Sequence, residues 1–358
     1  MKKTIVLRVD PQKPDREKIQ AAANIIKNGG LVAFPTETVY GLGADALNVK
    51  AVLALFEAKR RPLDNPPIIH VHDADDVYRL AKEVPSKAVV LMKKFWPGPL
   101  TLIFNRSKAV PDVTVAGLDT IAVRMPRHNV ALALIDESGC PIAAPSANLA
   151  GKPSPTTAKH VINDLNGRID VVLDAGPTHI GVESTVLDLT VDPPEVLRPG
   201  GTPYEALQKV VGKVDLDPLV LADKPLPVKK ARSPGLKHKH YAPDADMILV
   251  EGEMDAIAAK VDELVKVYKN EGKKIGVLAT DETISHYNAD IVKSLGSRTD
   301  MATVARNLFR LLREFDEEHV DVIVAEGMGV DGLGLAVMNR LRKAAGYTIV
   351  KAASDSQR

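Results

Sequence analysis

Four short islands of polar and basic residues lie at the ends of apolar, strand-like runs, at positions 35–43, 59–62, 145–148 and 197–201. The second island contains Lys59 and Arg61, and the fourth contains Arg198. Binding and catalytic groups tend to sit on loops that a rigid scaffold holds. Guanidinium groups recognise phosphates in a bidentate manner, and an ammonium group supplies a point charge. Together the islands predict a pocket for a polyanion.

Two of the islands also have a purely structural interpretation. Cations at the C-terminal end of a helix complement the helix dipole, which accounts for one of the basic residues at 59–61. Ser146 and Asn148 follow an apolar strand, so they either form a turn that caps the next helix or contact a nucleotide. Both interpretations stay open at this point.

Two further patterns resemble ligand sites. His70 and His72 share one face of a predicted strand, a spacing that suits zinc, but no third ligand is near, which favours His70 as a hydrogen-bonding group. Residues 327–332 match G-x-G-x-x-G between a predicted strand and helix. A dinucleotide-binding site also requires an acidic residue about 20 positions later, and none is present at the end of a further strand. The motif is therefore better explained as a tight turn than as a dinucleotide site. The chain also has no G-x-x-x-x-G-K-[ST] motif, so any ATP would bind without a standard P-loop.

Bulk composition excludes several classes of protein. The 358 residues include 47 basic and 46 acidic ones, and the net charge of +1 argues against a protein that coats nucleic acid by bulk charge. A local basic groove stays open. The single cysteine permits no disulfide within the chain and favours a reducing compartment. We see no signal peptide and no apolar stretch that approaches a membrane span, so we expect a cytoplasmic protein with no membrane contact.

The apolar periodicity predicts an α/β fold in two domains. Residues 15–28 form an amphipathic helix that Asp15 caps and Gly29 ends. Further helices are predicted at 48–59, 73–82, 86–95, 129–138, 156–165 and 203–211, and strands at 31–34, 68–71, 100–104, 121–123, 142–144, 171–173, 185–189 and 195–197. Because strands and helices mix irregularly, we expect a mixed sheet with antiparallel pairs over residues 1–212.

A boundary follows between 213 and 244, where Pro, Lys and Asp are frequent and no clean period exists, as in an extended linker. Strands at 246–250, 274–279, 321–325 and 347–350 then alternate with helices at 253–269, 300–315 and 335–345. This order predicts a small Rossmann-like parallel α/β domain over residues 245–358.

Six ordered motifs resemble the threonylcarbamoyl-AMP synthases with a YrdC-like catalytic domain. They are residues 34–42, Lys59-x-Arg61-Pro62, 96–101, 123–126, 144–148 with Gly151 and Ser154, and 197–200. The resemblance covers the chain almost continuously to about residue 212. Residues 233–243 then look like the linker of the long, two-domain form, and the tail looks like its extra domain. The sequence departs mildly from the family at two places. Position 236 is Leu where the family often has Met, and residues 67–69 are Pro-Ile-Ile where Leu is frequent.

The resemblance implies a reaction. L-threonine, bicarbonate and ATP, with Mg²⁺ bound to the nucleotide, would give threonylcarbamoyl-adenylate and pyrophosphate, which makes the enzyme a nucleotidyltransferase. A separate, transiently bound transferase would then pass the group to the adenosine next to the anticodon of certain tRNAs. A direct tRNA contact stays open. Negative charge gathers on the phosphates during such a reaction, so cations and Mg²⁺ would carry most of the catalysis and no protein nucleophile is required.

The resemblance also assigns roles position by position. Lys59 and Arg61 would be catalytic and hold the triphosphate. The nucleotide would contact Arg61, Asn65, Thr120, Ser146, Asn148, Ser154, Arg198 and, from a linker folded over it, Tyr241. Threonine would contact Thr38, His70, Arg124 and Ala144, with Arg124 pairing its carboxylate and Ala144 acting through its backbone. No protein metal ligand is implied.

Two rival functions fit parts of the sequence. An RNA-binding module with a basic face would use the same cations, although balanced charge and only 4% aromatic residues argue against it. A carbamoyl-adenylate synthase that feeds another acceptor would keep the fold and change the substrate. Threonine-dependent release of pyrophosphate separates the enzyme from the RNA-binding module, and replacing threonine by carbamoyl phosphate separates the two enzymes.

Overall fold

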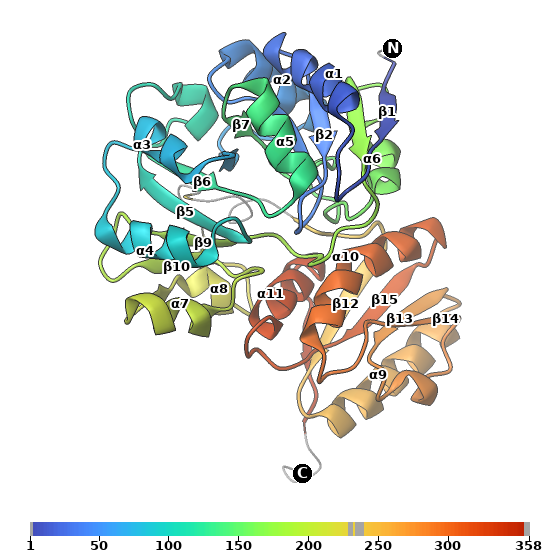
Figure 1. Cartoon of the computed structure of the whole chain (residues 1–358). Helices are drawn as coiled ribbons and strands as arrows, with labels where there is room; N and C mark the ends of the chain where they lie inside the picture. Colours follow the sequence, from blue (N-terminus) through green and yellow to red (C-terminus); the bar gives the residue numbers. More distant parts are fainter. Residues whose placement is uncertain (1–2, 228–231, 233–239, 354–358) are drawn as a thin grey trace. The chain divides into compact units, whose positions relative to one another are not determined.

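The computed structural model describes residues 3–227, 232 and 240–353, and its chain divides into two compact units (Figure 1). The first unit contains residues 1–150, 154–220 and 227–238, and the second contains 151–153, 221–226 and 239–358. The predicted bounds of the domains and the linker stay predictions. Most of the linker motif, including Leu236, lies outside the described residues.

An 11-stranded mixed sheet organises the first unit, which confirms the predicted fold class. Its strands, in spatial order, are β1 (Ile5–Arg8), β8 (Val171–Asp174), β2 (Val32–Phe34), β3 (Gly41–Asp45), β7 (Ile142–Ala143), β4 (Ile69–His70), β6 (Thr120–Arg124), β5 (Leu100–Asn105), β9 (Thr185–Asp188), β10 (Glu195–Arg198) and β11 (Asp215–Leu216). Antiparallel pairs such as β2–β3 and β5–β6 alternate irregularly with parallel pairs such as β4–β6.

The helices of this unit lie at nearly the positions that the periodicity predicts, except the last one, which falls within the stretch predicted as a linker. They are α1 (Arg16–Lys27), α2 (Val49–Lys59), α3 (Val77–Leu80), α4 (Ser86–Phe95), α5 (Asn129–Ser138), α6 (Ala158–Leu165), α7 (Tyr204–Val211) and α8 (Pro218–Leu221). Only α3 is much shorter than predicted, because a 3₁₀ turn at Ala74–Asp76 precedes it and Ala81 leaves the helical region.

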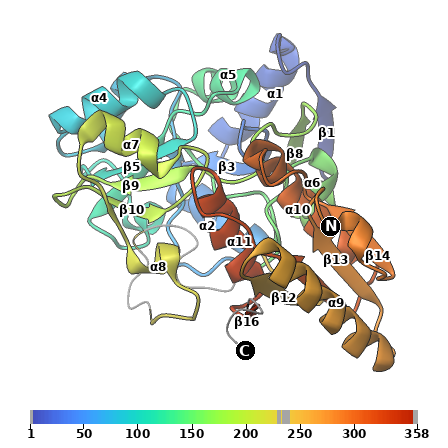
Figure 2. The ribbon, with the colours of Figure 1, turned by 90° about the horizontal axis from the view of Figure 1, so that it is seen from below.

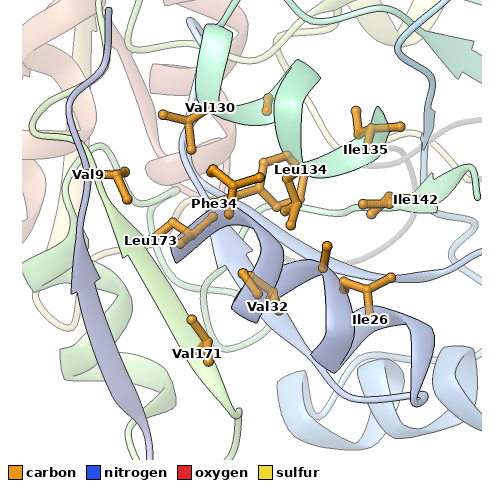
Figure 3. Packing of buried hydrophobic residues seen from close by; sticks show 14 of the residues in the cluster. Val9, Ile26, Val32, Phe34, Val130, Leu134, Ile135, Ile142, Val171 and Leu173 are labelled. Carbon is orange, nitrogen blue, oxygen red and sulfur yellow. The ribbon is translucent and has the colours of Figure 1, made fainter. Parts of the chain in front are cut away.

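Helix α1 shows how local sequence and packing agree. The Asp15 carboxylate accepts from the backbone N–H groups of Glu17 and Lys18, and so satisfies donors that a helix start leaves open. The four buried residues of the helix then face a cluster that includes Phe34 of β2 and Leu134 of α5 (Figure 3). This apolar core holds the carboxyl end of β2, where the first polar island begins.

The second unit contains an all-parallel sheet, as predicted, with five strands where four were predicted. Their order is β14 (Ile291–Ser294), β13 (Ile275–Ala279), β15 (Val322–Glu326), β12 (Asp246–Glu251) and β16 (Ile349–Lys351). Helix α9 (Met254–Asn270) packs along one face (Figure 2). Helices α10 (Met301–Glu317) and α11 (Gly334–Ala344) contact each other. A Cβ at Gly276 would lie 2.6 Å from the Phe315 ring of α10, so this glycine allows close approach on the other face.

The predicted tight turn after β15 is also present. A Cβ on Gly327 would lie 2.9 Å from the Val250 carbonyl, and one on Gly334 would lie 2.2 Å from the Gly329 carbonyl. These glycines are therefore required for close packing of strand and helix, whereas a Cβ on Gly329 would meet nothing within 4 Å. In the described part of the chain, no helix has both the length and the apolar character that crossing a membrane demands.

Candidate active site

Three neighbouring strands bring together the residues predicted to contact threonine. The parallel register of β4 and β6 places His70 beside Arg124. The Ile68 carbonyl accepts from the Ala144 backbone N–H at 2.9 Å and lies 3.2 Å from Nδ1 of His70. Thr38, from the loop between β2 and β3, accepts from Nη1 of Arg124 at 3.0 Å. We call these four residues the Arg124 cluster.

Arg124 is a buried cation, only 3% exposed, and its surroundings hold it in one orientation. Its Nε donates to the Gly98 carbonyl at 3.2 Å, and its Nη2 lies 2.7 Å from Oε2 of Glu37. A buried charge is tolerated when it is paired and hydrogen-bonded. The guanidinium is therefore positioned before any ligand arrives, as binding a carboxylate in a bidentate manner requires.

His70 is neutral at physiological pH. Burial lowers the pKa of its imidazole to about 3, and the positive charge of Arg124 acts in the same direction. The ring also meets Phe34 edge-on, at 6.2 Å between centroids. A neutral imidazole can offer hydrogen bonds without adding a second positive charge to the Arg124 cluster.

Lys59 joins the second island to the third. It is the last residue of α2 and only 1% exposed. Its Nζ donates to the carbonyls of Ser146 and Asn148, the latter at 2.5 Å. Since Ala144 lies two positions before Ser146, the ammonium group and the Arg124 cluster are tied to the same short stretch of chain after β7.

Arg61 organises the loop that follows α2. Its Nε donates to the Asn65 carbonyl at 2.9 Å and its Nη2 to the Pro66 carbonyl at 3.2 Å. Asn65 is buried, and among the residues that the structure describes its Oδ1 has no hydrogen-bond partner. An orphaned acceptor of this kind is uncommon in native proteins and suits a ligand that donates a hydrogen bond.

The segment 180–184 connects the remaining predicted residues to this region. Its Gly181 N–H donates to the Thr38 carbonyl at 3.1 Å. Glu183 accepts from the hydroxyl of Ser154 at 2.6 Å, and the Ser184 carbonyl accepts from Nη2 of Arg198 at 2.9 Å. Contacts along one short segment thus bring Ser154 and Arg198, 44 positions apart, toward the Arg124 cluster.

The last two predicted nucleotide contacts are Thr120 and Tyr241. Thr120 begins β6, whose last residue is Arg124, so the two stand at opposite ends of one strand. Tyr241 belongs to the second unit, where its ring stacks on Phe309 at 5.2 Å between centroids and the Arg340 guanidinium lies 5.4 Å away. The assignment of both residues to the nucleotide stays a prediction.

Comparisons with known proteins find relatives along nearly the whole chain. A family model described as "Telomere recombination" matches residues 24–200, and one described as "Threonylcarbamoyl-AMP synthase, C-terminal domain" matches residues 202–346. A threonylcarbamoyl-AMP synthase of Pyrococcus abyssi is 53% identical over 97% of this chain and 99% of its own length. The chain belongs to the threonylcarbamoyl-AMP synthase family. A second synthase, from Bacillus subtilis, is 49% identical over 96% of this chain and 95% of its own length.

Solved structures extend the likeness to three dimensions. A crystal structure of P. abyssi Sua5 complexed with L-threonine superposes with a TM-score of 0.92 at 52% identity. It covers 98% of this chain, and this chain covers 99% of it. The two-domain form of the threonylcarbamoyl-AMP synthases, inferred from the motifs, is thereby confirmed for this chain.

The sequence left three residues of the candidate site without a role. Glu37 pairs with Arg124, Glu183 accepts from Ser154, and Ser184 accepts from Arg198. Glu37 lies inside a recognised motif, so a lone carboxylate between Thr36 and Thr38 was a visible signal. Glu183 and Ser184 gave no such signal in the sequence, because their hydrogen-bond partners are distant along the chain. In the described ranges, no group of three or more His, Cys, Asp or Glu side chains could hold a metal ion.

Proposed function

We propose that this protein is an L-threonylcarbamoyladenylate synthase, a nucleotidyltransferase that converts L-threonine, bicarbonate and ATP into threonylcarbamoyl-AMP and pyrophosphate. One observation carries the proposal within the synthase family. A buried guanidinium cluster suited to an amino-acid carboxylate and a buried ammonium group suited to phosphate are tied to the same stretch, Ala144 to Asn148. A ligand pair with both chemistries fits this arrangement.

In the proposed reaction, bicarbonate takes up a proton and loses water to supply CO₂. The neutral threonine amine adds to the CO₂ carbon and releases a proton, which gives a carbamate. A carbamate oxygen then attacks the α-phosphorus of ATP, the bond from that phosphorus to the bridging oxygen breaks, and pyrophosphate leaves. Arg124 would hold the threonine carboxylate, with Thr38, His70 and the Ala144 backbone orienting the rest of the amino acid. Lys59 and Arg61 would stabilise the charge that develops on the phosphates, the largest catalytic effect available to such a site.

The other proposed nucleotide contacts are Asn65, Thr120, Ser146, Asn148, Ser154, Arg198 and Tyr241. ATP would enter as its magnesium complex. The phosphates would hold the ion, so none of the residues named above is proposed as a metal ligand. The product would be the substrate of a tRNA threonylcarbamoyl transferase in the cytoplasm. We propose that this transferase is a transient partner.

The test is threonine-dependent release of pyrophosphate by the full chain. Purified protein is incubated with MgATP, bicarbonate and L-threonine, pyrophosphate is followed by a coupled assay, and the adenylate is identified by mass spectrometry. We expect both products only when all three substrates are present. Pyrophosphate release that is indifferent to threonine, or that requires carbamoyl phosphate in its place, would assign the site to a different adenylate-forming reaction.

A further inference from the structure

Glu37 is a buried carboxylate with half of its bonding capacity unused. The residue is 2% exposed, and the loop that carries it is held by the Ile180 N–H, which donates to the Glu37 carbonyl at 2.9 Å. Oε2 pairs with Arg124 at 2.7 Å, whereas Oε1 has no hydrogen-bond partner among the described residues. Buried acceptors without partners are costly, so an unpartnered oxygen beside a binding cation points to a ligand that donates.

The charges around this oxygen are nearly balanced. Arg124 contributes one positive charge and Glu37 one negative charge. The two histidines nearby add none at neutral pH, because burial lowers the pKa of His70 to about 3 and that of His128 to about 4. The buried site therefore presents an ion pair with no net charge, rather than an isolated cation.

This distinction decides which small molecules the site favours. A lone buried guanidinium would attract any carboxylic acid anion, and most strongly one with no compensating positive charge. An Arg–Glu pair instead opposes a bare anion and favours a molecule that carries a carboxylate and an ammonium group close together. Selectivity can come from such repulsion as well as from attraction.

We propose that Glu37 is a specificity-determining residue, which makes the Arg124 cluster select an amino-acid zwitterion over a monoanionic acid of the same shape. The inference rests on the proposed function, because it concerns the amino-acid substrate of that reaction. It adds a reason for the choice, since the ammonium group that Glu37 selects becomes, after it loses a proton, the amine that must capture CO₂. An acid without the amine would occupy the site and form no carbamate.

The experiment compares two ligands by calorimetry on the full chain. L-threonine is one, and 2,3-dihydroxybutanoate, in which a hydroxyl replaces the amine, is the other. The wild-type protein should bind threonine at least ~10-fold more tightly, and Glu37→Gln should reduce that ratio by ~10-fold or more, the scale of one buried charge interaction. Glu37→Asp, which keeps the charge, should retain most of the preference. Glu57→Gln, which removes a carboxylate from the exposed face of α2, should leave it unchanged.

The outcomes separate selectivity from support of the fold. If Glu37 only positions Arg124, the Gln variant will weaken both ligands equally and the unchanged ratio will overturn the proposal. Thermal unfolding shows whether the Gln variant is folded. If it is not, the wild-type comparison decides, because equal affinity for the two ligands also overturns the proposal. A wild-type protein that binds neither ligand refutes the proposed function and this inference with it.

Discussion

Replacing Lys59 with methionine separates a catalytic ammonium group from a structural clamp. The Lys59 side chain is almost fully buried, and its Nζ donates to the carbonyls of Ser146 and Asn148. Methionine keeps the length of the aliphatic chain and removes the charge and the donors. Both interpretations predict a loss of stability, but only the catalytic one predicts a loss of turnover in protein that is still folded.

The size of each effect follows from the contacts. Two hydrogen bonds from a charged group are lost, each worth about 1.5–3 kcal/mol, while the cost of burying an ammonium group is relieved. We expect the free energy of unfolding to fall by about 2–4 kcal/mol. If the ammonium stabilises developing phosphate charge, turnover should fall by ~100-fold or more, which corresponds to about 2.7 kcal/mol of transition-state stabilisation.

The assay measures threonine-dependent pyrophosphate release at saturating ATP, well below the melting temperature of the variant. Lys50→Met is the matched control, because Lys50 is an exposed lysine of the same helix, and its variant should match wild type in both measurements. A Lys59→Met protein that is less stable but turns over within about threefold of wild type would refute the catalytic role. Lys59 would then be a clamp for the loop after β7.

Three further predictions use the same assay or simple unfolding measurements. Arg61→Ala should reduce turnover by ~100-fold or more, and near-normal turnover would remove Arg61 from the site. Arg124→Ala should raise the threonine KM far more than the ATP KM, so an equal rise in both would contradict its assignment. Neutral His70 should contribute to the free energy of unfolding in full above pH 6.5, and this contribution should be lost as the pH falls toward about 3. The reason is that His70 binds a proton in the unfolded state at a higher pH than in the folded state, where its pKa is lowered to about 3. Denaturant titrations of His70→Asn should show a shallower loss over that range, by up to roughly 1.4 kcal/mol per pH unit. An unchanged slope would show that His70 ionises normally. Part of the slope that remains in the variant comes from His128 and from carboxylates with a lowered pKa, such as Glu251 and Glu314.

Regular elements with strong local signals could be predicted from the sequence. Helix α1 has both a cap at Asp15 and an apolar face, so its bounds were predicted to within a residue. Strand β3 was missed because Gly41–Asp45 is rich in glycine and buried along most of its length, which hides the alternation typical of a strand. Strand β14 was missed for a related reason, since Ile291–Ser294 is only partly buried and has weak alternation.

Residue types and their order along the chain were enough to reveal the family, the two-domain α/β plan and the cations of the candidate site. The contacts between the residues of the candidate site could not be predicted from the sequence. The pairing of Glu37 with Arg124, the grip of Lys59 on two carbonyls and the bond between Ser154 and Glu183 join positions 29 to 89 residues apart. Such contacts form when strand register and loop closure bring chain segments together, and neighbouring residues carry no local preference for them.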